Sequence, residues 1–327
     1  MTDLLTVLAE HLVAAVLLVA LASQLAALLY PLFQRASRAV GADGRALLTW
    51  LYGLMPTLIA AVSVLLLHLP AVSGGLIPSH CHGSTCGAHT PQFGLASPAG
   101  ISLVLVCIAL AAIGLCLVQR AQRLARRRLY AMNLLSQPEP GRFWRLIESD
   151  EPRAWCAGYL RPQIFVTRGL ISALAPAQVQ AVLLHEWAHL QRRDNLRALL
   201  LQWATVLWPG GRKRRLWQDL HSATEQACDL AAARQAGSAT ELIAALQRLA
   251  ASPDAAPVSA MAASPAASAT GAGPDCAAVA SRVRQLQTTA PPAAFAAESW
   301  LMISALGAGQ IIALPVVAHI AIEWLTL

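Results

Sequence analysis

H-E-W-A-H occupies residues 185–189, inside a run whose helical periodicity predicts a helix from Pro176 to about Arg192. Residues four apart lie on one face of a helix, so His185 and His189 can reach a single metal ion. Glu186 stands beside them, where a carboxylate can polarise a metal-bound water. Two imidazoles, a general base and an open coordination position are typical of a hydrolytic zinc site. The alternative is a pair of surface histidines on a soluble helix.

The composition indicates a membrane protein. Of the 327 residues, 56% are hydrophobic and only 13% are charged, whereas a soluble globular domain carries about 25% charged residues. The net charge is +7, but the arginines cluster beside apolar runs. We therefore interpret them as topology signals and expect no direct contact with nucleic acid. The seven cysteines form no chain-wide disulfide framework, and only Cys81 and Cys86 are a close pair outside the predicted spans.

Four apolar runs are candidates to cross a bilayer of about 30 Å. The predicted spans are at about 4–31, 46–69, 101–118 and 299–327. The first is not expected to be a cleaved signal peptide, because it is too long and lacks a basic start.

The arginines predict the orientation of these spans. Three of them lie in the loop 34–45 and five follow the third span, whereas residues 71–99 contain no charged residue. The positive-inside rule then places both termini and the loop 71–99 outside. We predict a multi-pass, mainly α protein of the bacterial inner (cytoplasmic) membrane, with four transmembrane helices. A cytoplasmic α+β domain at 119–298, including a flexible segment at 252–275, lies between the third and fourth spans.

Within that domain, short strands are predicted at about 154–159 and 164–167. An extended peptide can pair with the edge of such a strand, or the two strands form an ordinary hairpin that covers the metal helix. The apolar run 196–208 is too short for a span, so it lies either against the membrane face or inside the domain. The basic residues 212–215 suit contact with anionic membrane lipid, or form a solvated turn.

A second predicted helix, at about 217–235, supplies the remaining site candidates. A catalytic zinc needs three protein ligands, and we choose Glu225 as the third. Asp229 lies one turn further on and suits a hydrogen bond to a ligand histidine, with Asp194 as its rival for that role. His221 is a candidate donor to the oxyanion of the reaction, or a packing or solvent-facing histidine.

Three segments resemble the BlaR/MecR family of membrane zinc metallopeptidases. They read A-G-Y-L-R-P-Q-I-F-V-T, H-E-W-A-H-L-Q-R-R-D-N and E-Q-A-C-D, against family patterns G…P-x-I, H-E-x-x-H-x-x-R-x-D and E-x-x-C-D. The resemblance is strong over about 150–235. It implies that His185, His189 and Glu225 bind one zinc ion and that Glu186 is the catalytic base. Positions that the family tends to keep are matched by Arg192, Asp194 and Asp229.

The resemblance also implies a zincin-like fold and a function. The expected reaction is signal-activated cleavage of a cytoplasmic BlaI/MecI-like winged-helix repressor, and of the protease itself. The penicillin-binding sensor domain that β-lactam receptors carry after the last span has no counterpart here, so this chain alone is not expected to read a β-lactam signal. Two alternatives are a housekeeping protease that clears damaged membrane proteins and a non-catalytic metal-responsive receptor with a structural zinc.

The predicted outer loop holds an unusual group of metal-binding side chains, namely His80, Cys81, His82, Cys86 and His89. Thiolates and imidazoles suit Cu(I) or Zn(II), which predicts a second metal site. A Cys81–Cys86 disulfide is the other interpretation. Either way, we interpret the loop as a metal or redox sensor coupled to the protease. The sequence does not decide whether the chain forms a homo-oligomer.

Overall fold

A computed structural model describes residues 2–67, 80–82, 85–87, 98–251 and 276–288, together with residues 301, 304, 316, 317 and 320. The predicted flexible segment 252–275, most of the predicted outer loop and nearly all of the predicted fourth span lie outside the described residues.

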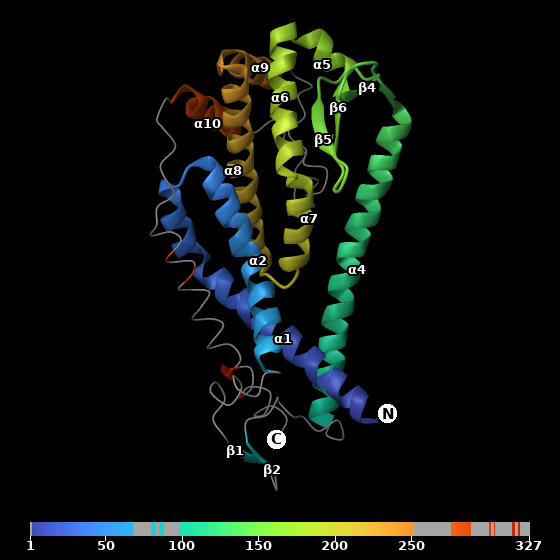
Figure 1. Cartoon of the computed structure of the whole chain (residues 1–327), viewed down its shortest axis with the longest axis vertical. Coiled ribbons are helices and arrows are strands. Elements are labelled where there is room, and N and C mark those ends of the chain that lie inside the picture. The colour runs from blue at the N-terminus through green and yellow to red at the C-terminus, as the bar shows by residue number, and fades with distance from the viewer. Residues whose placement is uncertain are drawn as a thin grey trace.

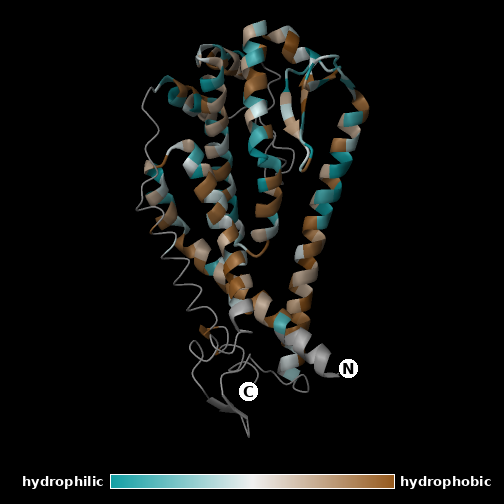
Figure 2. Cartoon of the chain, viewed as in Figure 1, coloured by the Kyte–Doolittle hydropathy of each residue, from teal (hydrophilic) through white to brown (hydrophobic). Residues whose placement is uncertain are grey.

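Three long helices dominate the first part of the chain, and one of them, α4, extends as far as the sheet (Figure 1). They are α1 (Thr2–Ala36), α2 (Ala42–Leu67) and α4 (Pro98–Leu135), and a short 3-10 helix, η1 (Ser37–Ala39), follows α1 directly. All three are long and apolar enough to cross a membrane, which confirms the prediction of three apolar spans in this part of the chain. Figure 2 shows that hydrophobic residues gather in the halves of α1, α2 and α4 that lie away from the sheet.

Helix α4 continues well past Val118, where the predicted third span ends. Residues 119–135 contain no glycine or proline and are rich in Arg, Leu and Ala, which are good helix formers. The helix therefore carries its arginines beyond its apolar half, and Figure 2 shows the change to hydrophilic residues along it.

A four-stranded sheet lies beside the far end of α4. Its strands are β3 (Ser136–Pro138), β4 (Trp144–Ile147), β5 (Ala154–Ala157) and β6 (Gln163–Thr167), in the order β3-β4-β6-β5. Only β4 and β6 are parallel. The predicted pair of strands corresponds to β5 and β6, whereas the short strands β3 and β4 were not predicted. The β5–β6 turn needs glycine, because Gly158 has φ +106° and a Cβ there would lie 2.9 Å from the Arg161 carbonyl oxygen.

In the described part of the chain, six further helices follow β6. They are α5 (Arg168–Ala173), α6 (Pro176–Arg192), α7 (Asp194–Ala204), α8 (Gly210–Ala236), α9 (Thr240–Ala250) and α10 (Cys276–Gln287). The metal helix α6 has the predicted bounds. Helix α8 begins earlier than predicted, so the basic residues 212–215 lie in its first turns. Helix α6 packs against the sheet on one side and α8 on the other (Figure 1).

Helices α6 and α7 are joined by a single residue, Arg193, in the left-handed conformation (φ 52°, ψ 44°). Helix α7 then packs against α2. The Trp50 indole donates a hydrogen bond to the Arg197 carbonyl oxygen at 2.9 Å, and a Cβ at Gly53 would clash with Leu201. The apolar run at 196–208 is thus buried along one face, while Trp203 remains exposed on another.

Candidate metal centre

The two histidines of the H-E-x-x-H sequence converge on one point. His185 and His189 lie one helical turn apart on the buried face of α6, with exposed fractions of 2% and 7%. Their Nε2 atoms are 3.2 Å apart. The shared face follows from the four-residue spacing, as the sequence predicts.

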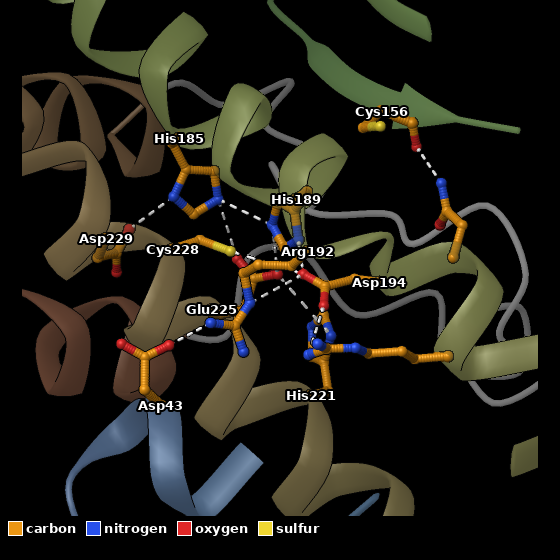
Figure 3. A network of polar contacts seen from close by, with 12 residues as sticks. Asp43, Cys156, His185, His189, Arg192, Asp194, His221, Glu225, Cys228 and Asp229 are labelled. Atoms are coloured by element: carbon orange, nitrogen blue, oxygen red, sulfur yellow. Dashed lines mark hydrogen bonds and ion pairs between the residues drawn. The ribbon is translucent and has the colours of Figure 1, made fainter. Parts of the chain in front are cut away.

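Helix α8 brings a carboxylate to the same point. Glu225 Oε2 lies 3.5 Å from His185 Nε2, and Oε1 lies 3.4 Å from His189 Nε2. Two atoms bound to one tetrahedral zinc ion at about 2.0–2.1 Å lie roughly 3.3 Å apart. The three separations therefore fit a zinc ion bound by these three side chains (Figure 3).

Each imidazole is held from behind by a carboxylate. His185 Nδ1 lies 2.9 Å from Asp229 Oδ1, and His189 Nδ1 lies 2.9 Å from Asp194 Oδ2. A carboxylate at Nδ1 fixes the tautomer that leaves Nε2 free to bind a metal. The sequence weighed Asp194 and Asp229 as rivals, but the structure brings both to the site, one for each histidine.

The Glu186 side chain is almost fully buried beside the two histidines on α6. Burial raises the pKa of its carboxyl above the ordinary value, although the charges of the two imidazoles and of Arg282 act in the opposite direction. A carboxylate with a raised pKa is a better proton acceptor, which is the property that a general base requires.

Arg192 connects the site to α2, one of the candidate membrane helices. Its guanidinium forms an ion pair with Asp43, in the first turn of α2, and its Nε lies 3.5 Å from Asp194 Oδ2 (Figure 3). Arg192 thus lies behind Asp194, as expected for a residue that orients a ligand-holding carboxylate. Asp43 could not be identified from the sequence, because no spacing relates it to a helix almost 150 residues away.

Two further side chains lie near the cluster. His221 Nδ1 is 3.9 Å from Glu225 Oε1 and its side chain is 44% exposed; its role as an oxyanion donor stays a prediction. Cys228 Sγ lies 3.7 Å from Asp194 Oδ2, and Cys228, Asp194 and His189 form a second possible ligand group. Burial raises the pKa of the Cys228 thiol to about 11, which disfavours the thiolate form that binds metals.

Arg282, on α10, is a site residue that sequence reasoning missed. Its guanidinium donates two hydrogen bonds to Asp229, at 2.7 and 2.6 Å, and lies 3.2 Å from Glu225 Oε2. Burial alone would raise the pKa of both carboxyls, but Arg282 helps to hold them below their ordinary values. Arg282 stands shortly before the predicted fourth span, where a basic residue is also expected as an orientation signal, so its sequence position gave no reason to place it at the site.

The outer loop is described only in part. Strands β1 (His80–His82) and β2 (Thr85–Gly87) form an antiparallel hairpin in which Cys81 is the register partner of Cys86. Their side chains and His89 lie outside what is described. The choice between a second metal site and a disulfide is therefore untested.

Residues 118–250 match the model of Peptidase family M48. The match includes both histidines, Glu186 and Glu225, and it ends before α10 and Arg282. It implies zinc metalloprotease activity. No solved structure shows significant similarity to the chain.

Proposed function

We propose that the chain is a membrane-bound zinc metalloendopeptidase whose site is made by His185, His189, Glu225 and Glu186. One observation carries this proposal. Two imidazoles of α6 and the Glu225 carboxylate of α8 lie 3.2–3.5 Å from one another. The buried Glu186 carboxylate, whose pKa is raised, lies beside them. A pair of unrelated surface histidines would have no such carboxylate partners.

The buried side chains divide the work of peptide hydrolysis. Zinc held by the three ligands would supply a Lewis acid for the scissile carbonyl and acidify a water. Glu186 takes the proton of the attacking water and returns it to the leaving amine. Asp229 and Asp194 keep the imidazoles in the tautomer that binds metal, and the burial of the group excludes bulk water.

The sheet offers a place for the substrate backbone. Strand β5 is at the edge of the sheet next to α6, and an extended peptide can add to such an edge. The Asn195 amide donates to the Cys156 carbonyl oxygen of β5 at 3.0 Å, so one edge acceptor is already paired. This arrangement supports an endopeptidase that binds its substrate as an extended strand.

The substrate we propose is a BlaI/MecI-like winged-helix repressor, together with the protease itself. The match to the M48 family, which includes the BlaR/MecR type, supports this choice. A cytoplasmic site is supported by the arginines of α4, which lie on the same side of the apolar helix segments as the metal centre. We further propose that the protein lies in the inner membrane, that residues 299–327 form a fourth span and that the loop 71–99 is a sensor.

A cleavage assay in membranes tests the proposal. Wild type, Glu186→Gln and the control Glu148→Gln are each expressed with the candidate repressor, and fragments of both proteins are blotted. Glu148 is an exposed carboxylate paired with Arg168, so its loss should change nothing. We expect fragments from wild type and control, and a loss of about 10²–10⁴-fold in Glu186→Gln. Equal fragments from all three would refute catalysis and favour a metal-responsive receptor. Cleavage of many unrelated proteins would favour the housekeeping protease.

A further inference from the structure

The turn between α7 and α8 lies among the candidate membrane helices (Figure 1). We call residues 203–209 the hairpin tip. The Gln24 amide of α1 donates a hydrogen bond to the Leu207 carbonyl oxygen at 3.4 Å. The Thr57 hydroxyl of α2 donates to the Ala204 carbonyl oxygen at 3.3 Å. Both donors lie inside stretches that are long and apolar enough to cross a membrane, so the hairpin tip is at the depth of the apolar helix segments.

Helix α4 shows how far the hairpin tip enters the apolar layer. A Cβ at Gly114 would lie 3.3 Å from a methyl group of Val206, so the two residues are at one level. The first charged residue of α4, Arg120, comes six residues after Gly114, which is about 9 Å along a helix. Arginines at the end of an apolar span mark the edge of the bilayer. The hairpin tip therefore lies about 9 Å inside that edge.

The hairpin tip and the residues around it have the composition that this depth requires. Residues 198–211 contain no charged residue. Trp203 is 40% exposed and Leu200 is 45% exposed, so large apolar side chains remain available to the surroundings. Beside Trp203, a cavity of about 160 Å³ is lined only by apolar residues of α1, α4 and the hairpin tip. Such a cavity offers water no hydrogen-bond partners, but it suits an acyl chain.

Four basic residues, 212–215, follow soon after the hairpin tip, and we call them the basic run. Among the residues that the structure describes, none of the four forms an ion pair with a carboxylate. They stand in the first turns of α8, where the helix dipole disfavours cations. Neither ion pairs nor the helix dipole therefore account for the basic run, whereas the negative surface of an anionic membrane attracts Lys and Arg.

The basic run lies at the height of the bilayer edge. The next residue, Leu216, packs against α2 at Gly53, where a Cβ would lie 3.0 Å from Leu216 Cδ2. Gly53 is one turn, or about 6 Å, from Thr57, which contacts the hairpin tip. Measured along α2 or along α4, the basic residues nearest to the hairpin tip thus lie about 6–9 Å from it. Two separate helices therefore place the bilayer edge at a similar height.

We propose that the hairpin tip is inserted among the acyl chains of the membrane and that the basic run binds the headgroups of anionic phospholipids. The metal centre lies at the opposite end of α7, a helix of 11 residues, which is about 16 Å long. Insertion of the hairpin tip then holds the metal centre at a fixed height close to the membrane surface. The proposal does not depend on catalysis, because none of these residues belongs to the metal centre.

Photocrosslinking tests the depth of the hairpin tip. Full-length protein with Trp203→p-benzoylphenylalanine is irradiated in nanodiscs of phosphatidylglycerol and phosphatidylcholine, and mass spectrometry detects lipid adducts. The same replacement at Leu105, which is 60% exposed in the apolar part of α4, shows the yield of a lipid-facing position. The replacement at Phe143, which is 54% exposed beside Trp187 of α6, shows the background. We expect position 203 to form lipid adducts as position 105 does.

Lipid titration tests the basic run. Native mass spectrometry measures the affinity of detergent-solubilised full-length protein for phosphatidylglycerol and for phosphatidylcholine. We expect wild type to prefer phosphatidylglycerol, and Arg214→Gln/Arg215→Gln to lower this preference about fivefold or more, because each basic residue at the surface attracts the anionic lipid. The matched control Arg142→Gln/Arg248→Gln removes the same charge from exposed positions between β3 and β4 and on α9, and it should keep the preference. Thermal melting verifies that each variant is folded.

Two results would overturn the proposal. One is that position 203 forms no lipid adducts, or crosslinks to a second copy of the chain, while position 105 reacts with lipid. That result would place the hairpin tip in solvent or in a protein interface. The other is a phosphatidylglycerol preference that is unchanged in Arg214→Gln/Arg215→Gln, or that falls equally in the matched control. That result would leave the basic run as a solvated turn of α8.

Discussion

The two metal-facing imidazoles have equivalent partners but different surroundings. Behind His185, Asp229 receives two hydrogen bonds from Arg282, whose side chain is only 11% exposed. Behind His189, Asp194 lies 3.5 Å from Arg192, which in turn pairs with Asp43, a residue that is 51% exposed. One side is a closed ion-paired network, and the other opens toward the surface and a membrane-span helix.

This difference separates stability from metal binding. A buried ion pair that loses one partner leaves an uncompensated charge, which costs about 3–5 kcal/mol. A pair that can turn to water costs far less. Each carboxylate lies 2.9 Å from the Nδ1 atom of one metal-facing histidine, so both should affect zinc affinity, but only the His185 side should affect folding strongly.

Glu225→Gln should have the largest effect on metal binding, because this carboxylate faces both imidazoles. Since loss of a supporting residue weakens metal binding about 10–100-fold, loss of a direct ligand should weaken it by about 100-fold or more. Zinc titration against a competing chelator measures this affinity. Stoichiometric, tight zinc in Glu225→Gln would mean that another side chain, such as Cys228, is the third ligand.

Asp229→Asn should be the most destabilising change, because the buried Arg282 then loses the carboxylate that accepts two of its hydrogen bonds and keeps only its ion pair with Glu225. We expect a loss of about 3–5 kcal/mol in the free energy of unfolding and about 10–100-fold in zinc affinity. Thermal melting and zinc titration measure the two effects. The double variant Asp229→Asn/Arg282→Met should recover stability but not zinc affinity; recovery of both would show that Asp229 only neutralises Arg282.

Asp194→Asn should lower zinc affinity by a similar 10–100-fold, while stability falls by only about 1 kcal/mol because the guanidinium groups of Arg192 and Arg197 lie nearer to solvent. The same two measurements apply. A stability loss as large as that of Asp229→Asn would remove the proposed contrast between the two sides.

Asp43→Asn should have the smallest effect, below about 1 kcal/mol, because the half-exposed carboxylate is well solvated. We expect zinc affinity to change less than about threefold, because Asp43 reaches the His189 imidazole only through Arg192 and Asp194. Asp43→Glu, which keeps the charge, is the control. If Asp43→Asn weakened zinc as much as Asp194→Asn, the α2 contact would be needed to hold His189.

The sequence predicted those parts of the site that depend on local spacing. The shared face of His185 and His189 follows from helical geometry, and Glu225 and Asp229 lie one turn apart on a helix that was also predicted. Arg282 and Asp43 could not be found in this way. Each reaches the site through packing between elements distant in sequence, and each has an ordinary explanation at its own position, as a topology signal or as the first turn of a helix.

The fold, too, could be predicted only where the local sequence pattern is strong. The long apolar helices and the β5–β6 hairpin carry strong patterns, and Gly158 marks the turn. Strand β3 is the three residues Ser-Gln-Pro, which include no β-branched or aromatic residue, so its sequence does not indicate a strand. Strand β4 is as short as β5, and its pairing with β6 is a contact between segments separated in sequence. The extension of α4 was missed because the loss of hydrophobicity after Val118 marks the end of an apolar run, whereas only a helix-breaking residue marks the end of a helix.

Because Arg193 is the only residue between α6 and α7, the two helices are joined at a fixed angle. The left-handed conformation of a non-glycine residue such as Arg193 costs about 1–2 kcal/mol. A longer loop could absorb a displacement of one helix relative to the other, whereas one residue leaves little freedom between the two helix ends. Trp50 and Gly53 of α2 pack against α7, and His189 lies near the end of α6, close to Arg193. We therefore expect a tilt of α2 to displace α7 and, through Arg193, the end of α6 that carries His189.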